Sequence, residues 1–330
     1  MSATRRFALF LAATLFFTVA PELHAAPTRG AWTASLEDSG DRLHLNTTRR
    51  RNENNGQTLA LSEFTNLSAA QIRSASQTPV SFELRREAGT IAFEGVFKGG
   101  EGAGHFTFTP SSTYEASLRA LGLSVDDWKG RRDDDDPLFH LAMFDVSTSF
   151  IRDMRAAGYR ESLDTYVSMR IFRVTPQLIE EFRQVGFKGL SADELVSAQI
   201  HKATPAYIRE MRAAGFTKLD MDDFVASRIH KITPEFARGM KAAGYDLSHD
   251  DLMAFRIHKV TPEFIGELRA LGYTKVDADD LVAMRIHKVT PEFIREVRAA
   301  GYTNVPVEKL ISMRIHKIDP KFISKMNGNQ

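Results

Sequence analysis

The sequence predicts a two-part α+β protein, in which a small antiparallel β domain precedes an α-solenoid of short helix-turn-helix repeats. Two observations predict this fold class. Apolar and polar residues alternate through the first third of the chain, which is typical of half-buried strands. Through the remainder a proline recurs every 28 or 29 residues, and a fixed period of that size is typical of stacked helical repeats. We therefore expect a β domain over residues 27–110, a degenerate capping repeat over 111–147 and six helical hairpins over 148–330.

The composition is that of an ordinary globular protein. Among 330 residues, 43% are hydrophobic and 26% are charged, which provides enough apolar material for a core. The 43 Lys and Arg nearly balance the 42 Asp and Glu, so no bulk positive field attracts polyanions, and we predict no nucleic-acid partner. The chain contains no cysteine, so the fold is predicted to depend on packing without disulfides.

Residues 1–25 have the pattern of a secretory signal peptide. Arg5 and Arg6 provide the charged start, residues 7–20 are apolar, and the small residues of Leu23–Ala26 suit cleavage. An uncleaved anchor is the alternative, but fourteen apolar residues fall short of the ~20 that span a bilayer. No second apolar stretch approaches that length. We therefore expect a periplasmic or secreted mature chain without stable membrane insertion.

The first third predicts a meander of five or six antiparallel strands. Within Val80–Phe108, Ala88-Gly89 and Gly99–Gly104 separate three alternating runs as turns would. The glycine-rich segment also suggests a phosphate-binding loop, but it lacks the Lys-Ser/Thr of a P-loop and no helical pattern follows it, which favours a hairpin turn. The basic Thr48–Arg51 is interpreted as a solvated strand end, and a short helix is expected at Ser68–Ser74.

Each repeat begins with a helix that starts at Thr-Pro and ends at glycine. The threonine oxygen is a favourable N-cap, and proline at the first helical position has no N–H to leave unpaired. The glycine then takes the left-handed conformation that closes a helix, and the aromatic residue after it supplies an apolar contact. The predicted N-caps are Thr175, Thr204, Thr233, Thr261, Thr290 and Asp319, and the closing glycines are Gly158, Gly186, Gly215, Gly244, Gly272 and Gly301.

A second helix follows in each repeat and ends near the sequence Arg-Ile-His-Lys. Its predicted starts are Ser162, Ser191, Asp220, Ser248 and Asp277, and four of these have an acidic residue three positions later, as in a capping box. Each helix is shorter than the ~12–15 residues at which an isolated helix becomes marginal in water, so the hairpins must stabilise one another by stacking.

A degenerate unit precedes the six hairpins. Tyr114–Gly122 and Leu138–Val146 match the two helices of a repeat, with the acidic Arg131–Pro137 between them. Atypical terminal units are expected, since they cap the stack. We interpret the aspartates as complementing the dipole at a helix start, against the alternative of a metal site.

The predicted partner contacts form a ladder of histidine and lysine at the ends of the second helices. Leu281, Val282 and Ile286 are expected in the apolar face, so His287 should face solvent. Imidazoles of stacked helices ~8–10 Å apart are too distant to share a zinc ion, and we predict no metal site. The alternative role is contact with the helix's own terminal carbonyls. The ladder comprises His201, His230, His258, His287 and His316 with Lys202, Lys231, Lys259, Lys288 and Lys317.

An arginine row accompanies this ladder. Arg285 falls inside the predicted apolar face, so its stem should be covered and its guanidinium should bind a neighbouring helix end or a carboxylate. Gln199 replaces the arginine in one unit, which suits a hydrogen-bonding role better than a phosphate-binding one. The row comprises Arg170, Arg228, Arg256, Arg285 and Arg314.

The sequence lacks the common catalytic signatures. It has no cysteine nucleophile, no G-x-S-x-G elbow, no H-E-x-x-H and no Walker loop. We therefore predict no enzyme activity, no catalytic residue and no cofactor. The alternatives are an enzyme or metal-binding protein with its site in the β domain, near His105, and a structural spacer of the bacterial envelope.

The repeat consensus, "TPEFIRELRAAGYTKLDMDDFVASRIHKI" as a composite of the units in Thr148–Met326, resembles helical-hairpin repeats of exported bacterial proteins. It is also similar to repeats in the periplasmic tails of some membrane metallopeptidases of the beta-lactam-sensor type. The membrane region and zinc motif of those peptidases are absent from this sequence, so protease activity is not implied. The resemblance implies a sensing or interaction role in the envelope. The expected function is a scaffold that binds a protein or peptide partner.

Overall fold

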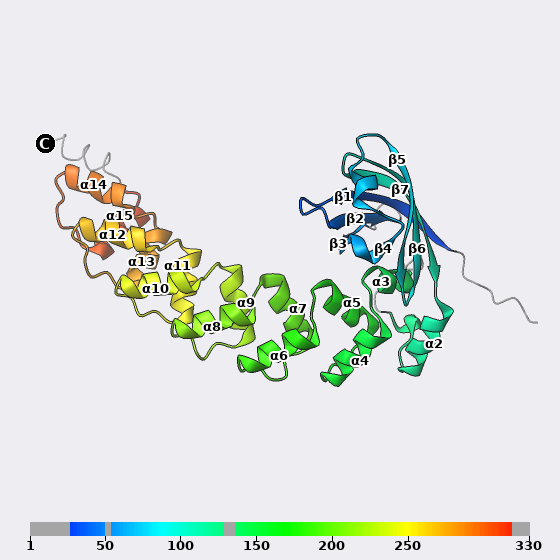
Figure 1. The fold of residues 1–330 in the computed structure, drawn as a ribbon. Coiled ribbons are helices and arrows are strands. Elements are labelled where there is room, and N and C mark those ends of the chain that lie inside the picture. The colour runs from blue at the N-terminus through cyan, green and yellow to red at the C-terminus, as the bar shows by residue number, and fades with distance from the viewer. Residues whose placement is uncertain (1–26, 50–53, 129–135, 319–330) are drawn as a thin grey trace, which may run out of the picture. The chain divides into compact units, whose positions relative to one another are not determined.

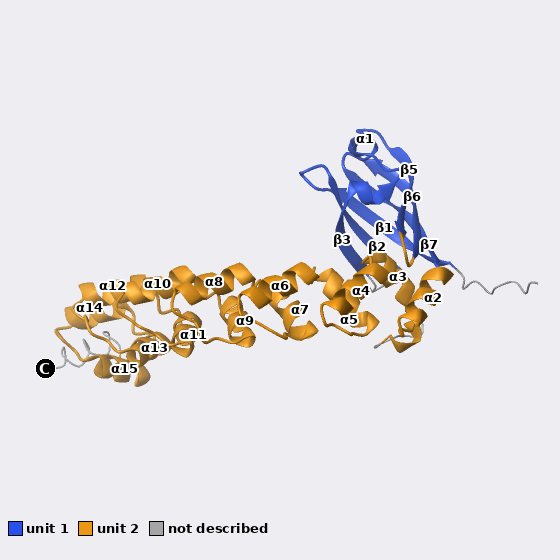
Figure 2. Cartoon of the chain, turned by 60° about the horizontal axis from the view of Figure 1, so that its bottom comes forward, with its two compact units in different colours: residues 1–85, 89–111 blue, residues 86–88, 112–330 orange. Residues whose placement is uncertain are grey.

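The computed structural model describes residues 27–49, 54–128 and 136–318. The predicted signal peptide, Arg50 and Arg51, most of the acidic insertion and the last N-cap, Asp319, lie outside the described residues. The chain divides into two compact units, one of residues 1–85 with 89–111 and one of residues 86–88 with 112–330 (Figure 2). The first contains the sheet and the second the helical repeats, which confirms the predicted fold class.

The first unit is one antiparallel sheet of seven strands in the order β3-β2-β1-β7-β6-β5-β4 (Figure 1). The strands are β1 (Thr28–Leu36), β2 (Arg42–Thr48), β3 (Asn54–Ala60), β4 (Phe64–Thr65), β5 (Thr78–Arg86), β6 (Gly89–Lys98) and β7 (Glu101–Pro110). A 3-10 helix, Leu61–Glu63, and the expected short helix, α1 (Ala69–Arg73), lie between strands. The predicted meander of five or six strands is corrected in two ways, because there are seven strands and β1 pairs with β7 rather than starting at an edge.

The core of the sheet unit surrounds Trp32, which is 1% exposed. Its ring lies 5.4 Å from the rings of Phe82 and Phe97, centroid to centroid, and its indole N–H donates to the carbonyls of Glu94 and His105 at 3.2 and 3.1 Å. The polar atom of the largest core side chain is therefore satisfied while the ring remains in an aromatic cluster. The rings of this cluster come from β1, β4, β5, β6 and β7, and alternate residues of β2, such as Leu43 and Leu45, are also buried, as the period-two pattern predicted.

The glycine-rich segment is a hairpin turn only in part. Gly99 and Gly100 turn the chain with φ of +60° and +95°, as predicted. Gly102 and Gly104 instead lie within β7. A Cβ at Gly104 would stand 1.9 Å from the carbonyl oxygen of Glu94 on β6, so glycine is required there by the close approach of two strands.

The second unit contains seven helical hairpins, because the predicted degenerate unit is a hairpin of α2 (Ser112–Ala120) and α3 (Pro137–Met143). A short 3-10 helix, Val125–Asp127, follows α2. The first helices of the next six units are α4 (Thr148–Ala156), α6 (Pro176–Gln184), α8 (Pro205–Ala213), α10 (Pro234–Ala242), α12 (Pro262–Ala270) and α14 (Pro291–Ala299). The second helices are α5 (Leu163–Ile171), α7 (Ala192–His201), α9 (Met221–Ile229), α11 (His249–Ile257), α13 (Ala278–Ile286) and α15 (Val307–Ile315).

First and second helices form separate layers of the array (Figure 2). Within a layer each helix packs on its equivalent in the next unit, as α7 does on α9 and α12 on α14. The interior between the layers is made of one set of apolar positions repeated in every unit, such as Leu281 and Met284, both 0% exposed. Because the helices of the array have only seven to ten residues, each depends on these neighbours for its stability.

The predicted helix starts are confirmed for the first helices. The side-chain oxygens of Thr175, Thr204, Thr233, Thr261 and Thr290 each accept the backbone N–H three positions later. Among the second helices, Ser191, Asp220 and Ser248 form capping boxes, whereas Ser162 and Asp277 make no capping hydrogen bond to the backbone. The first helices end at glycine as predicted, with φ between +84° and +110°.

The tyrosine after the closing glycine also connects consecutive units in three of the hairpins. The hydroxyls of Tyr159, Tyr245 and Tyr273 each donate to a carbonyl just before the second helix of the following unit, Leu190, Val276 and Val305 respectively, at 2.7 Å. Burial raises the pKa of all three hydroxyls above its ordinary value. The tyrosines are therefore linkers between hairpins in addition to apolar contacts at a helix end.

Candidate binding surface

Every second helix of the six units ends at a lysine or arginine with a left-handed backbone. In the unit of α13, the N–H of Lys288 donates to the carbonyl of Arg285, and the N–H of Val289 donates to that of Met284 at 2.7 Å. These two bonds define a Schellman end, whose left-handed position is usually glycine. The left-handed residues are Arg173, Lys202, Lys231, Lys259, Lys288 and Lys317, with φ between +55° and +59°.

The first helices close with the same pair of hydrogen bonds but use glycine. In α14, the N–H of Gly301 donates to Arg298 and that of Tyr302 donates to Val297. A non-glycine residue in the left-handed region costs about 1–2 kcal/mol, and a cation at a helix C-terminus recovers about 0.3–1 kcal/mol. The chain thus places glycine at six first-helix ends and a cation at six second-helix ends, although the backbone requirement is the same. The choice of cation is not explained by the helix end alone.

An exposed isoleucine stands two positions before each of these cations. The six side chains are Ile171, Ile200, Ile229, Ile257, Ile286 and Ile315, and they are 42% to 52% exposed. The prediction that Ile286 belongs to the apolar face is wrong. The buried face of α13 is centred on Leu281 and Met284, whereas Val282 is only partly buried, and at ~100° per residue Ile286 points away from that centre.

The predicted histidines lie between the isoleucines and the cations. His201, His230, His258 and His287 are partly exposed, and His316 is exposed. The backbone carbonyls of three of them accept hydrogen bonds from arginines, and no three His, Asp or Glu side chains gather around a possible metal position in residues 27–49, 54–128 and 136–318. The five predicted lysines are exposed. Isoleucine, histidine and cation occupy three consecutive positions at the end of the second helix in five of the six units, with phenylalanine in place of histidine in the first, and we name these residues the Ile-Lys edge.

The arginine row holds consecutive second helices together, as predicted. The Nε of Arg285 donates to the carbonyl of His258 at 3.2 Å, and the Nε of Arg314 donates to that of His287 at 3.2 Å. The other three bonds of the row are Arg228 to His201, Arg256 to Lys231 and Arg170 to Phe144, the last with an ion pair to Asp145 at 2.6 Å. Each guanidinium therefore binds the end of the equivalent helix one unit earlier.

An aromatic ring lies beneath each guanidinium of this row. The carbon of the Arg256 guanidinium is 4.1 Å from the ring centroid of Phe236, and that of Arg285 is 4.9 Å from Phe264. The same contact joins Arg170 to Phe150, Arg228 to Tyr207 and Arg314 to Phe293. In the unit where Gln199 replaces the arginine, Leu178 replaces the ring, so both members of the cation–π pair change together.

A second arginine row joins the first helices, and the sequence analysis missed it. The guanidinium of Arg155 donates to the carbonyl of Leu121 at 2.7 Å, and that of Arg183 to Ala157 at 2.8 Å. Arg212, Arg269 and Arg298 make the equivalent bonds to Val185, Ala243 and Leu271. The available signal was an arginine three positions before every closing glycine except Gly244, where Lys241 stands. These contacts between units are thus made by arginines and not by the lysines of the Ile-Lys edge.

Three glutamates, Glu235, Glu263 and Glu292, follow the first proline of a first helix, and the first and last of them are paired with arginines, whereas Glu263 forms no ion pair among the described residues. Glu235 and Glu292 begin the first helices α10 and α14 and pair with Arg238 and Arg295 at 2.7 and 3.1 Å. Hydrogen bonds from their own backbone N–H groups lower the pKa of both carboxyls, so both are ionised. Within the part of the chain that the structure describes, none of the five lysines forms an ion pair. Their charges are available to a partner.

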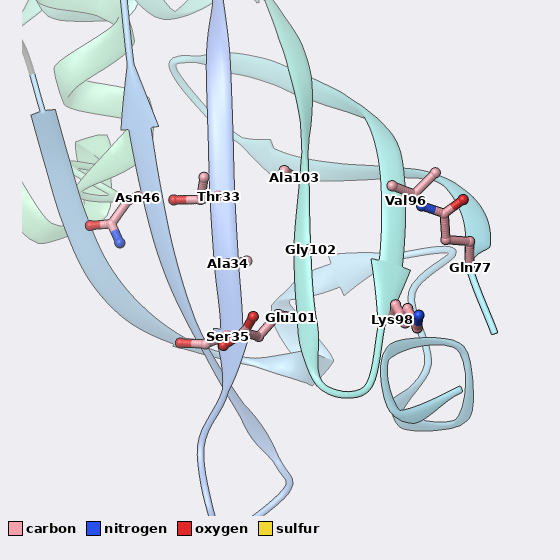
Figure 3. A pocket seen from close by; sticks show the side chains of 10 residues that line it. All are labelled: Thr33, Ala34, Ser35, Asn46, Gln77, Val96, Lys98, Glu101, Gly102 and Ala103. Carbon is pink, nitrogen blue, oxygen red and sulfur yellow. The ribbon is translucent and has the colours of Figure 1, made fainter. Parts of the chain in front are cut away.

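An open recess of about 560 Å³ lies on the sheet of the β domain. Its lining comes from β1, β2, β6 and β7 with Gln77, and Figure 3 shows the polar groups of Asn46, Ser35 and Lys98 spread apart rather than converging. His105, the residue proposed for an alternative site, is exposed on β7 and does not line the recess. Ser35 and Lys98 are both cross-strand neighbours of Glu101 in the lining, and among the described residues no hydrogen bond or ion pair joins these three side chains.

One constellation in the helical array has the residue types of a catalytic triad. The Oγ of Ser227 lies 2.8 Å from Nε2 of His249, whose Nδ1 lies 3.8 Å from a carboxylate oxygen of Asp223. Ser227 is 0% exposed, so a substrate has no access to its hydroxyl. The serine stands where Met284 stands in a later unit, and the smaller side chain makes room for the imidazole. This constellation is a buried polar contact between α9 and α11.

No protein-family model, curated protein or solved structure matches the chain. Within the described residues, no helix combines the length and the apolar character that a membrane crossing needs.

Proposed function

We propose that the protein is an exported, non-enzymatic interaction scaffold of the bacterial envelope, whose helical array binds a protein or peptide partner along the Ile-Lys edge. The observation that carries this proposal is the repetition of a half-exposed isoleucine beside a cation in the left-handed conformation, once in each of six units. Lysine or arginine stands at these left-handed positions although glycine would adopt the same backbone conformation without strain. Such strained backbone positions are typical of functional sites.

The chemistry of the edge supports recognition of a polypeptide. Exposed apolar side chains flanked by charges are typical of interaction surfaces. Regular rows on helical arrays give extended surfaces, on which many weak contacts add along one ligand. The two arginine rows support the proposal indirectly, because they fix the spacing of consecutive units and hence the spacing of the edge residues.

Export is supported by the signal-peptide pattern of residues 1–25. The resemblance of the repeats to those of exported bacterial proteins agrees with a periplasmic or secreted location. Fractionation of the producing cells tests this part, with the mature chain expected in the periplasm or medium and shortened at its N-terminus by about 25 residues.

Site-specific photocrosslinking tests the binding role in the cells that produce the protein. A photoreactive residue replaces Ile257 on the edge in one variant and the exposed Arg209 on the first helix α8 in a matched variant. We expect a discrete adduct with a polypeptide from position 257 and none from position 209. Equal adducts from both positions, or no adduct from any edge position, would overturn the proposal.

The alternatives predict different results in the same experiment. An enzyme or metal-binding protein that uses the β domain would place adducts at the recess, for example at Val96, which is 39% exposed. A structural spacer would give no discrete adduct from the edge, and lengthening or shortening the array would alter the cell envelope instead. Each result excludes the scaffold proposal in its present form.

A further inference from the structure

The Ile-Lys edge restricts the conformation and charge of what it binds. We propose that its ligand is an acidic polypeptide segment in the polyproline II conformation, laid along the edge with one turn of the ligand on each repeat. This inference rests on the proposed binding function and adds the class of ligand to it.

The charge of the edge requires an acidic partner. Arg173 and the five lysines supply one exposed cation per unit over six units. Glu235 and Glu292, which follow the first proline of α10 and α14, are bound to arginines of their own helices. Glu263 has the same position in α12, is exposed, and forms no ion pair among the described residues, so it offsets one of the six cations. The terminal carbonyls of the second helices are likewise occupied by the arginine row, as in the bond from Arg285 to His258. The uncompensated charge along the edge is positive, so complementarity selects a ligand with regularly spaced carboxylates.

The spacing of the edge selects the ligand conformation. Equivalent residues on packed neighbouring helices repeat about every 8–10 Å. A polyproline II segment has three residues per turn and rises ~3.1 Å per residue, so its side chains return to one face about every 9.3 Å. A β-strand returns to one face after about 6.6 Å, and an α-helix after about 5.4 Å. Of these three conformations only polyproline II places one equivalent side chain on every unit.

The exposure of the isoleucines favours a polypeptide over a membrane surface. Each isoleucine is about half covered, from 42% to 52% exposed. Side chains that insert between lipids project beyond the surrounding surface, whereas a half-covered side chain forms a shallow apolar contact for one ligand residue. The predicted segment therefore carries an acidic residue and an apolar residue in each turn. A segment that contacts all six units has about 18 residues.

A synthetic peptide tests this inference directly. The probe is fluorescein-labelled (Glu-Leu-Pro)₆, and the matched control has the same composition with its glutamates grouped together. Binding to the full mature chain is measured by fluorescence anisotropy at low and high salt. We expect the periodic peptide to bind at least about tenfold more tightly than the grouped one, and its affinity to fall as salt rises. Equal affinity for the two peptides would overturn the inference.

Replacement of the edge lysines by glycine provides a variant that should still fold. Glycine suits the left-handed position, so K202G/K231G/K259G/K288G/K317G should retain the helical circular dichroism of the parent. We expect this variant to lose about tenfold or more in affinity for the periodic peptide. Unchanged affinity would show that the edge does not bind it. A variant with the five lysines replaced by glutamine keeps a long side chain at each left-handed position but removes the charge. It should lose affinity to a similar extent.

The outcomes separate this inference from the proposed function. A polypeptide adduct at Ile257 in cells, together with no peptide binding in solution, overturns the ligand class and leaves the scaffold role intact. Loss of the adduct at Ile257 overturns both. A third experiment measures binding to vesicles of phosphatidylcholine with phosphatidylglycerol. If the chain binds these vesicles through the edge lysines but does not bind the periodic peptide, the ligand of the edge is a lipid surface and the inference of a polypeptide ligand is wrong.

Discussion

The Nε of Arg285 on α13 donates a hydrogen bond of 3.2 Å to the carbonyl of His258, which ends α11 in the preceding unit. The same guanidinium covers the ring of Phe264 in its own unit, 4.9 Å from the centroid. One side chain therefore joins a hairpin internally and attaches it to its neighbour. It also satisfies a carbonyl that a helix C-terminus would otherwise leave to solvent.

Loss of this arginine should destabilise the array. R285M keeps an apolar stem but removes the donor and the charge, and we expect the free energy of unfolding to fall by about 2–3 kcal/mol. Denaturant titration followed by circular dichroism measures the change. The matched control is Q199M, in the unit without the arginine–aromatic pair, where we expect a change below about 0.5 kcal/mol. Equal effects at the two positions would contradict the structural role of the row.

The unit that lacks the pair should accept it. L178F and Q199R restore the aromatic residue and the arginine found in the other units, and we expect the double variant to be more stable than the sum of the single changes by about 0.5–1.5 kcal/mol. A double-mutant cycle measured by denaturant titration gives this coupling energy. An absence of coupling would show that the two residues change independently.

The two kinds of helix end should respond in opposite directions. G301A places a side chain at φ of +95°, and we expect it to destabilise the chain by about 1 kcal/mol or more. K288G removes a side chain from φ of +57°, and we expect the stability to stay within about 1 kcal/mol of the parent or to rise. Thermal unfolding of the two variants beside the parent checks both expectations. A large loss from K288G would mean that the lysine is structural.

The tyrosine linkers should make the array sensitive to alkaline pH. Burial raises the pKa of Tyr159, Tyr245 and Tyr273 above the ordinary value of 10.0. The folded state therefore favours the neutral hydroxyl, so the stabilisation is fully present below pH 10 and is lost as pH rises through the raised pKa values. Equilibrium unfolding between pH 8 and 11 measures this loss. Y159F/Y245F/Y273F should be less stable at neutral pH by about 1 kcal/mol per hydrogen bond and should show a smaller decline above pH 10.

The isoleucines of the edge should contribute little to folding. I257S exposes no cavity, because the side chain is already 52% exposed, and we expect a loss below about 1 kcal/mol. L252A in the same helix removes a side chain that is 1% exposed, and we expect a loss of about 2–5 kcal/mol. Denaturant titration compares the two. A comparable loss from I257S would show that the isoleucine is a core residue.

The repeat architecture was predictable because local signals agree with one another in every unit. Thr-Pro starts, glycine ends and the 28 or 29 residue period all point to the same hairpin, so Thr261 and Gly272 could be assigned without coordinates. The covered position of Arg285 followed from the helical wheel. The period-two pattern predicted the strands, but the pairing of β1 with β7 depends on contacts 73 residues apart, which a local pattern does not encode.

The edge was predicted only in part. His287 and Lys288 were identified as a ladder, but Ile286 was assigned to the core, because an apolar residue beside Val282 suggests one continuous apolar face. The exposure of Ile286 follows from the centre of the buried face, which lies at Leu281 and Met284 rather than at Leu281 and Val282. A left-handed lysine has no sequence signal of its own, since glycine or asparagine is the usual residue there.

In both arginine rows each arginine binds a carbonyl of the preceding unit, so the arginine contacts between neighbouring units are equivalent. Whole repeats can therefore be removed from the array or added to it. Excision of residues 233–260 would join Ile232 to Thr261, a junction with the same residue types as every other joint. Arg285 would then meet the terminal carbonyl of His230 in place of His258. Deletion or duplication of a 28 or 29 residue repeat in the gene would thus leave every inter-repeat contact of the same type. Natural variants with arrays of different length can therefore arise one repeat at a time, without changes to the residues that join the repeats.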